Sequence, residues 1–263
     1  MTELFRAGSA ELTTALVIGL LGVCRLGSAM LASPILGGRL VPPTVRLALA
    51  LGLTLLFAPT LRAGLPETPG LAWLVTTAVK EVLIGAALGF LAGIPLWAAE
   101  AAGRLTDGAR GGPLGELQGG GDGSNTPLGE LGLRLGLVLL FASGGHLVFL
   151  RGVALSYDAF PLDGAPDPAR VALLGDAALG AASQLVLAAL TMAAPVLAAL
   201  FVADLVLGLI GRIAPQLGVA PTVLPARALL GVLVLALALA SIAAALRGQL
   251  VLTLRGLFGL LGA

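Results

Sequence analysis

Some ionisable residues lie well inside long apolar stretches of this sequence, among them Arg25, Lys80, Glu81 and Asp204. A charge among apolar side chains is costly unless it has a partner or a task, such as passing a proton. Lys80 and Glu81 are neighbours that diverge on a helix, so we expect each to meet a group on another helix or chain. A proton-coupled carrier of a small solute would also use such carboxylates. No acidic series recurs along one helix face, so the carrier stays an alternative.

A second set of charges lies where one apolar stretch ends. Glu100 and Arg104 are four residues apart, in the order that favours an ion pair on a helix, and Asp107 follows about one turn later. We interpret this set as local ion pairing near a helix end.

The run from Asp107 to Arg110, with Asp122 beyond it, weakly resembles the metal- and diphosphate-binding signature of the CDP-alcohol phosphotransferases. The spacing differs from that signature and the closing pair of aspartates is absent, so a two-metal site would have too few oxygen ligands. The glycines that follow form no P-loop, because no Gly-Lys-Ser/Thr follows them. A transferase is therefore an unfavoured alternative.

His146 and Cys24 are each the single residue of their type. One histidine without a carboxylate cluster is a poor metal site, and one cysteine cannot form an intrachain disulfide. We interpret His146 as a hydrogen-bonded structural residue and Cys24 as packing. The sequence thus predicts no catalytic residue, no metal site and no cofactor.

The elements that must position these charges are membrane helices. The mean hydropathy is +1.04, 58% of the residues are hydrophobic and only 11% are charged, which leaves too little polar surface for a water-exposed globule. The formal net charge is +1, so the chain has no basic field that would attract nucleic acid. Composition therefore predicts a polytopic integral membrane protein that contacts lipid and no nucleic acid.

Continuously apolar stretches predict helices instead of a β-barrel, whose strands alternate with period two. The stretches are Leu12–Ser33, Val45–Leu61, Leu71–Ala99, Leu131–Leu150, Val171–Ile210 and Ala226–Leu246, with a short seventh at Leu250–Ala263. Alternating the loops between two sides divides the arginines evenly, which gives no orientation.

Two of these stretches are too long for a simple crossing. Leu71–Ala99 would extend ~44 Å as a helix against a hydrocarbon core of ~30 Å, and Pro95 lies near its end. Val171–Ile210 is longer and contains Pro195. We therefore expect an all-α fold of long broken helices and hairpins, some of which pack in protein and not in lipid.

Glycines mark two further features. Gly85, Gly89 and Gly93 recur every four residues and form a groove along one helix face, which predicts close approach of another helix. The stretch Gly103–Glu130 is so rich in glycine that we expect a flexible loop instead of a regular element. As a plain linker it would need no function.

Several runs in chain order resemble the SctT/FliR export-apparatus proteins. They are Pro42–Ala50, Glu81–Asp107, Pro127–Gly129, Phe141–His146, Ser156-Tyr157, Pro161-Leu162 and, most strongly, Ala203–Leu217. The resemblance covers nearly the whole chain, and it implies one membrane domain over residues 1–263. It implies a single-copy, non-enzymatic subunit of the type III export gate, which forms a helical channel for unfolded secreted proteins across the bacterial inner membrane.

The same resemblance implies partners and roles. The partners would be SctR/FliP-like and SctS/FliQ-like membrane subunits, together with the SctU/FlhB-like switch protein and an SctV/FlhA-like protein. Residues 103–130 would enter the pore and help to plug it, with Gly103, Asp107, Arg110, Gly111, Gly112, Gly119, Gly120, Gly121 and Pro127 as the residues of that loop. The assembly charges would be Arg46, Glu81, Glu100, Asp204 and Arg212.

Two departures from the family pattern concern the loop and the C-terminal part. Gly108-Ala109 stand where the family usually has a glutamine, and Arg227 stands near a usual lysine. The short loop between Pro127 and the next predicted helix, together with the run Phe141–His146, favours the virulence injectisome over the flagellar machine.

Overall fold

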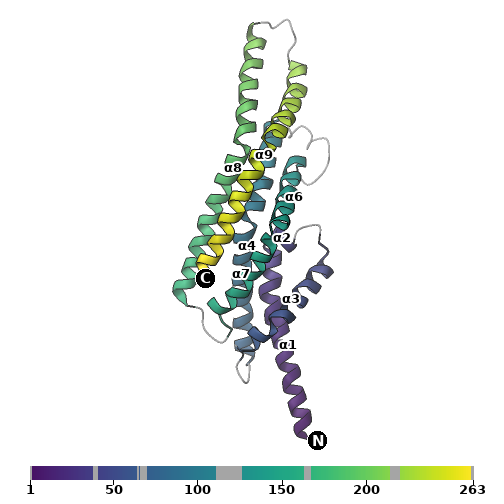
Figure 1. Ribbon diagram of the computed structural model, residues 1–263, viewed down its shortest axis with the longest axis vertical. Helices are drawn as coiled ribbons and strands as arrows, with labels where there is room; N and C mark the ends of the chain where they lie inside the picture. Colours follow the sequence, from purple (N-terminus) through teal and green to yellow (C-terminus); the bar gives the residue numbers. More distant parts are fainter. Residues whose placement is uncertain are drawn as a thin grey trace. The chain divides into compact units, whose positions relative to one another are not determined.

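The computed structural model describes residues 2–37, 41–63, 65, 70–110, 126–162, 167–213 and 220–261. Every regular element in these ranges is a helix (Figure 1), and the order is α1 Thr2–Leu31, α2 Pro34–Gly37, α3 Pro43–Ala63, α4 Leu71–Ala109, α6 Pro127–Ala142, α7 Gly145–Ala159, α8 Pro168–Ile213 and α9 Ala220–Leu261. The all-α prediction is confirmed.

Four of the described helices are long and apolar enough to cross a membrane. They contain the spans Glu11–Leu31, Leu71–Ala109, Pro168–Ile213 and Arg227–Thr253, and the broken pair α6 and α7 can make a fifth. The chain is therefore a multi-pass membrane protein. The stretch predicted at Val45–Leu61 forms only a short apolar helix, Pro43–Pro59, within α3.

Three predicted boundaries were wrong. Helix α4 continues beyond Ala99 to Ala109. Pro95 and Pro195 lie inside α4 and α8, where a membrane helix tolerates one missing backbone hydrogen bond. The predicted helix Leu131–Leu150 is broken between α6 and α7, where Gly144 has φ 73°, a left-handed conformation that glycine adopts without a steric penalty. The short seventh stretch continues the sixth in α9.

The chain forms two compact units. Unit 1 comprises residues 1–93, 144–181 and 253–263, and unit 2 comprises residues 94–143 and 182–252. In unit 1, α1 packs against α3, and the core between α1, α3 and α7 is made of Val17, Ile18, Leu21, Leu61, Tyr157 and Leu162.

Glycines allow α4 to approach a neighbouring helix closely in each unit. In unit 1, a Cβ atom on Gly85 would overlap the carbonyl of Arg25, and one on Gly89 would overlap the carbonyl of Ala29. The glycine groove of α4 is thus filled by α1 of the same chain. In unit 2, a Cβ on Gly103 would overlap the backbone of Leu128 in α6. Close backbone approach of this kind is the usual role of small residues in membrane helices.

Candidate functional site: the base of the glycine-rich segment

The glycine-rich stretch begins and ends in regular helix. Residues 103–109 form the last turns of α4, and Pro127 is the first residue of α6, so the predicted loop was too long at both ends. Thr126 caps α6, since its side chain accepts a hydrogen bond from Gly129 N at 3.2 Å, and proline suits the first helical position. The predicted loop residues Gly111, Gly112, Gly119, Gly120 and Gly121 lie outside the described residues.

Asp107 joins the two ends of this stretch. Its carboxylate accepts a hydrogen bond from the backbone N–H of Leu128 at 2.7 Å and also forms an ion pair with Arg110. The N–H groups of a first helical turn have no partner within their own helix, and a carboxylate there also interacts favourably with the helix dipole. Asp107 is therefore a second cap of α6, supplied by the last turns of α4.

Arg227 of α9 reaches the same place. Its Nη2 donates to the carbonyl of Ala109, the last residue of α4, at 2.6 Å. Its Nε lies 3.1 Å from Oδ1 of Asp204 on α8. The carbonyls at the C-terminal end of a helix lack partners within the helix, so this guanidinium caps α4 while it pairs with α8.

Arg110 completes the cluster. A Cβ atom on Gly231 of α9 would overlap the aliphatic carbons of the Arg110 side chain, so this side chain lies across α9 at a position that only glycine leaves open. We name the set Asp107, Ala109, Arg110, Leu128, Asp204 and Arg227 the loop base. Two carboxylates balance two guanidinium groups in the loop base, and four helices of unit 2 contribute to it.

A second polar cluster is buried in unit 1. Nε and Nη2 of Arg25 donate to the two oxygens of Glu81 at 2.6 and 2.7 Å, and both side chains are 0% exposed. Nη1 donates to Ser156 Oγ at 3.0 Å, and the guanidinium lies 4.0 Å from the centroid of the Tyr157 ring. The ion pair and these additional contacts compensate, within the protein, for the desolvation of both charges.

The cluster in unit 1 also caps the C-terminal end of α7. Arg25 donates to the Phe160 carbonyl at 2.8 Å, and Arg170 of α8 donates to the Ala159 carbonyl at 2.7 Å. Lys80 donates to the carbonyls of Pro161 and Leu162 at 2.7 and 3.2 Å. Three cations from three helices thus occupy the negative end of the helix dipole.

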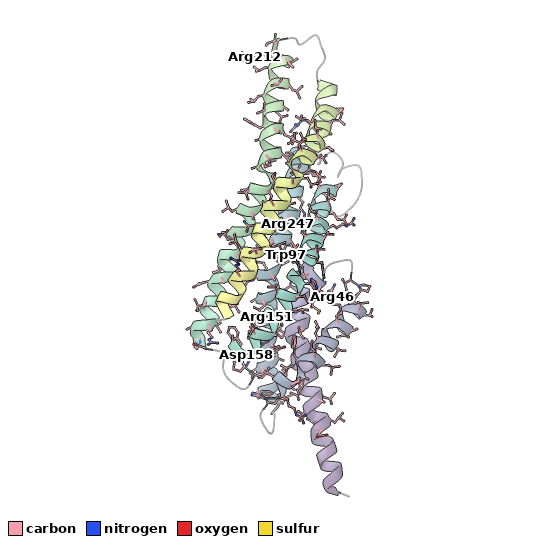
Figure 2. All side chains as sticks on the ribbon, in the orientation of Figure 1. Arg46, Trp97, Arg151, Asp158, Arg212 and Arg247 are labelled. Atoms are coloured by element: carbon pink, nitrogen blue, oxygen red, sulfur yellow. The ribbon has the colours of Figure 1, made fainter. Side chains whose placement is uncertain are left out.

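The remaining predicted charges take simpler positions. Glu100 and Arg104 form the local ion pair that the sequence predicted. Arg46 donates to the carbonyl of Val41 at 3.3 Å, near the start of α3. Arg212 is exposed at the C-terminal end of α8 (Figure 2). Gly93 is buried within α4, and His146 lies in the first turn of α7.

Sequence reasoning placed Glu81 and Asp204 among assembly charges but identified neither partner. The side chain of Arg25 bonds to Glu81, Ser156 and Phe160, which lie 56 to 135 residues away in sequence, and no local spacing encodes such contacts. The one usable signal was burial, because a lone Arg25 and a lone Glu81 in apolar stretches each require an opposite charge. The described residues contain no group of three or more His, Cys, Asp or Glu that could hold a metal.

Comparison with known proteins adds a family. Residues 16–251 match the family described as bacterial export proteins, family 1. This range contains the loop base and the buried cluster of unit 1.

Individual relatives come from two kinds of machinery. The chain is 34% identical to Yop proteins translocation protein T of Yersinia pestis over 157 residues, which is 59% of this chain and 60% of that protein. It is 29% identical to the flagellar biosynthetic protein FliR of Caulobacter vibrioides over 223 residues, 83% of this chain and 87% of that one. It is 27% identical to FliR of Bacillus subtilis over 92% of this chain and 95% of that one. The match thus covers only about three fifths of the Yersinia relative.

Proposed function

Because the chain belongs to the bacterial export proteins, family 1, we propose that it is a subunit of a type III protein export channel in the bacterial inner membrane. The observation that carries this proposal is the extent of the match, since residues 16–251 hold all four candidate spans except residues 11–15 of the first and 252–253 of the last. The relatives are named as translocation, secretion-apparatus and flagellar biosynthetic proteins.

The work we assign to the chain is structural and not catalytic. It completes a channel with SctR/FliP-like and SctS/FliQ-like membrane subunits, and it meets the SctU/FlhB-like and SctV/FlhA-like proteins. Unfolded secreted proteins pass through that channel. The greater identity to the Yersinia translocation protein supports the injectisome branch, although the flagellar relatives match over a longer part of the chain.

The loop base has a definite role in this proposal. Residues 111–125 close the channel, and Asp107 fixes the two ends of that segment by joining the last turns of α4 to the first turn of α6. A closing segment must exclude ions at rest and yield to a passing chain. Fixed ends with a glycine-rich middle meet both needs, because glycine changes conformation at little steric cost.

The glycine residues of α4 allow close helix packing within the subunit. Gly85 and Gly89 hold α1 against α4, so their packing role is within this chain, and Gly103 does the same for α6. The surfaces left for partner subunits and lipid include α8 and α9, because only 33% and 11% of the residues in their most apolar stretches are buried.

The test is purification of the tagged protein from its native membrane in a gentle detergent, followed by mass spectrometry of the proteins that co-purify. The proposal expects small helical membrane subunits in excess over this chain. Recovery of the chain alone or as a homodimer, together with solute transport by the isolated chain in liposomes, would overturn it in favour of a carrier.

A matched pair of variants refines the test. Asp107→Ala removes the link between α4 and α6, whereas Glu130→Gln alters an exposed ion pair with Arg134 on α6. Both variants should co-purify with the partners. Only Asp107→Ala should let ions leak through the resting channel, which a membrane-potential dye measures.

A further inference from the structure

Arg227 makes two contacts of unequal quality at the loop base. The bond from Nη2 to Ala109 is a short, aligned hydrogen bond, whereas Nε lies within ion-pair distance of Asp204 without the alignment of a hydrogen bond. The side chain of Arg227 is 26% exposed and that of Asp204 is 40% exposed. An exposed ion pair contributes only about 0–1 kcal/mol, so the link to α8 is the weaker of the two.

The position of these contacts gives them a consequence. Ala109 is the last residue of α4, and residues 111–125 follow directly, so Arg227 caps the turn from which the glycine-rich segment leaves. Asp204 is the only carboxylate that the described residues place in an ion pair with Arg227, and it lies on a different helix from Arg227. The position of α8 relative to α9 therefore affects the stability of the last turn of α4.

We propose that Arg227 is a latch that couples the α8–α9 pair to the last turn of α4. This inference rests on the proposed function, since it assigns a regulation to the same loop base. While Asp204 holds the guanidinium, Arg227 caps Ala109 and the last turn of α4 is ordered. When α8 shifts and Asp204 withdraws, Arg227 loses the contact that holds its side chain in place at the end of α4, so the cap weakens and the turn loosens. The weak ion pair with Asp204 is the contact that opens, and the hydrogen bond to Ala109 passes the change to α4.

A spin label at position 108 reports this turn directly. Gly108 is exposed on α4 and a Cβ atom there meets nothing within 4 Å, so Gly108→Cys should not disturb the packing. The native thiol is removed by Cys24→Ser. The labelled protein is purified as the complex that it forms in its native membrane, and the electron paramagnetic resonance spectrum gives the fraction of mobile label.

Asp204→Asn keeps the shape of the side chain and removes its charge, so the mobile fraction should rise, by up to about fivefold for a weak ion pair. Arg227→Met removes both contacts and should raise it further. Arg227→Lys keeps a donor for Ala109 and should lie between the parent protein and Arg227→Met. The matched control is Arg247→Gln, an exposed arginine of α9 (Figure 2), which should leave the spectrum unchanged.

The outcomes separate the latch from the proposed function. Spectra of Asp204→Asn and Arg227→Lys that equal the control overturn the latch, whatever the channel exports. If Arg227→Met yields no complex, these two variants still decide the question. A parent protein that purifies without membrane partners contradicts the proposed function, while the spectra of the chain alone still test the contact between Arg227 and α4.

Discussion

In both polar clusters, an arginine that is paired with a carboxylate caps the C-terminal end of a helix, but the two pairs differ in burial. In unit 1, Arg25 donates to the carbonyl of Phe160 at the end of α7 and is neutralised by Glu81. In unit 2, Arg227 donates to the carbonyl of Ala109 at the end of α4 and is paired with Asp204. The first pair is completely buried and bidentate, whereas the second is partly exposed and held through one nitrogen.

Because the two ion pairs differ in burial, they differ in the free energy needed to open them. Breaking a buried pair leaves an uncompensated charge in a low-dielectric interior, at a cost of about 3–5 kcal/mol, whereas an exposed pair contributes about 0–1 kcal/mol. The cluster of unit 1 is therefore a fixed part of the frame. The loop base can open at a cost that a partner subunit or a passing chain can supply.

The largest effect is expected at Glu81. Glu81→Ala leaves the Arg25 guanidinium buried without its counter-ion, so we expect a loss of about 3–5 kcal/mol and poor accumulation in the membrane. Thermal unfolding of the purified complex and the amount of protein in the membrane fraction measure it. Glu130→Gln is the control, because its partner Arg134 is 56% exposed, and it should change stability by less than about 1 kcal/mol. Equal effects of both variants would remove the distinction between the clusters.

The next effect separates two glycines of α4 that are five residues apart. Gly103→Ala must displace the backbone of Leu128, so we expect a loss of about 1–3 kcal/mol from overpacking between α4 and α6. Gly108→Ala meets open space and replaces glycine in a helix, so stability should rise by up to about 1 kcal/mol. Melting temperatures of the two variants should move in opposite directions. A parallel change would show that α4 and α6 are not in close contact at Gly103.

The sequence predicted the fold class well because composition and long apolar stretches determine it. The glycine groove of α4 was also readable, since Gly85 and Gly89 recur with helical spacing, but the helix that fills it was not. Glycine content misled the prediction at Gly103, where a tightly packed helix was taken for the start of a loop. Composition cannot tell a glycine that permits flexibility from one that permits close packing, because both lack a side chain.

The partners of the buried charges could not be predicted, because they depend on tertiary contacts. Arg25 meets Glu81 from α4 and Ser156 from α7, and any of several charges in apolar stretches could have filled the first role. Asp204 was marked by its position in an apolar stretch, but its pairing with Arg227 requires that α8 and α9 lie beside each other.

A third prediction concerns the contact of Arg110 with α9. Gly231→Ala would force the Arg110 side chain away from α9 and disturb its ion pair with Asp107. Because a long side chain can adopt another rotamer, we expect a modest loss of up to about 1 kcal/mol in stability and a measurable ion leak at rest. Gly248→Ala, on the same helix and in open space, is the control for membrane-potential measurements. A leak in both variants would attribute the effect to α9 as a whole and not to Arg110.

The smallest effect is expected at Lys80, which tests whether burial or position decides the role of a charge. Lys80 shares the end of α7 with Arg25, where it donates to the carbonyls of Pro161 and Leu162, and its side chain is partly exposed. Lys80→Gln retains a donor for the Pro161 carbonyl and leaves no buried charge unpaired. The expected loss is therefore below about 1 kcal/mol, far less than at Glu81 one residue away. Thermal unfolding of Lys80→Gln beside Glu81→Ala makes the comparison. If the two losses were similar, the capping of α7 and not the buried ion pair would hold unit 1 together. The difference between this cluster and the loop base would then lie in the number of cations at the helix end and not in burial.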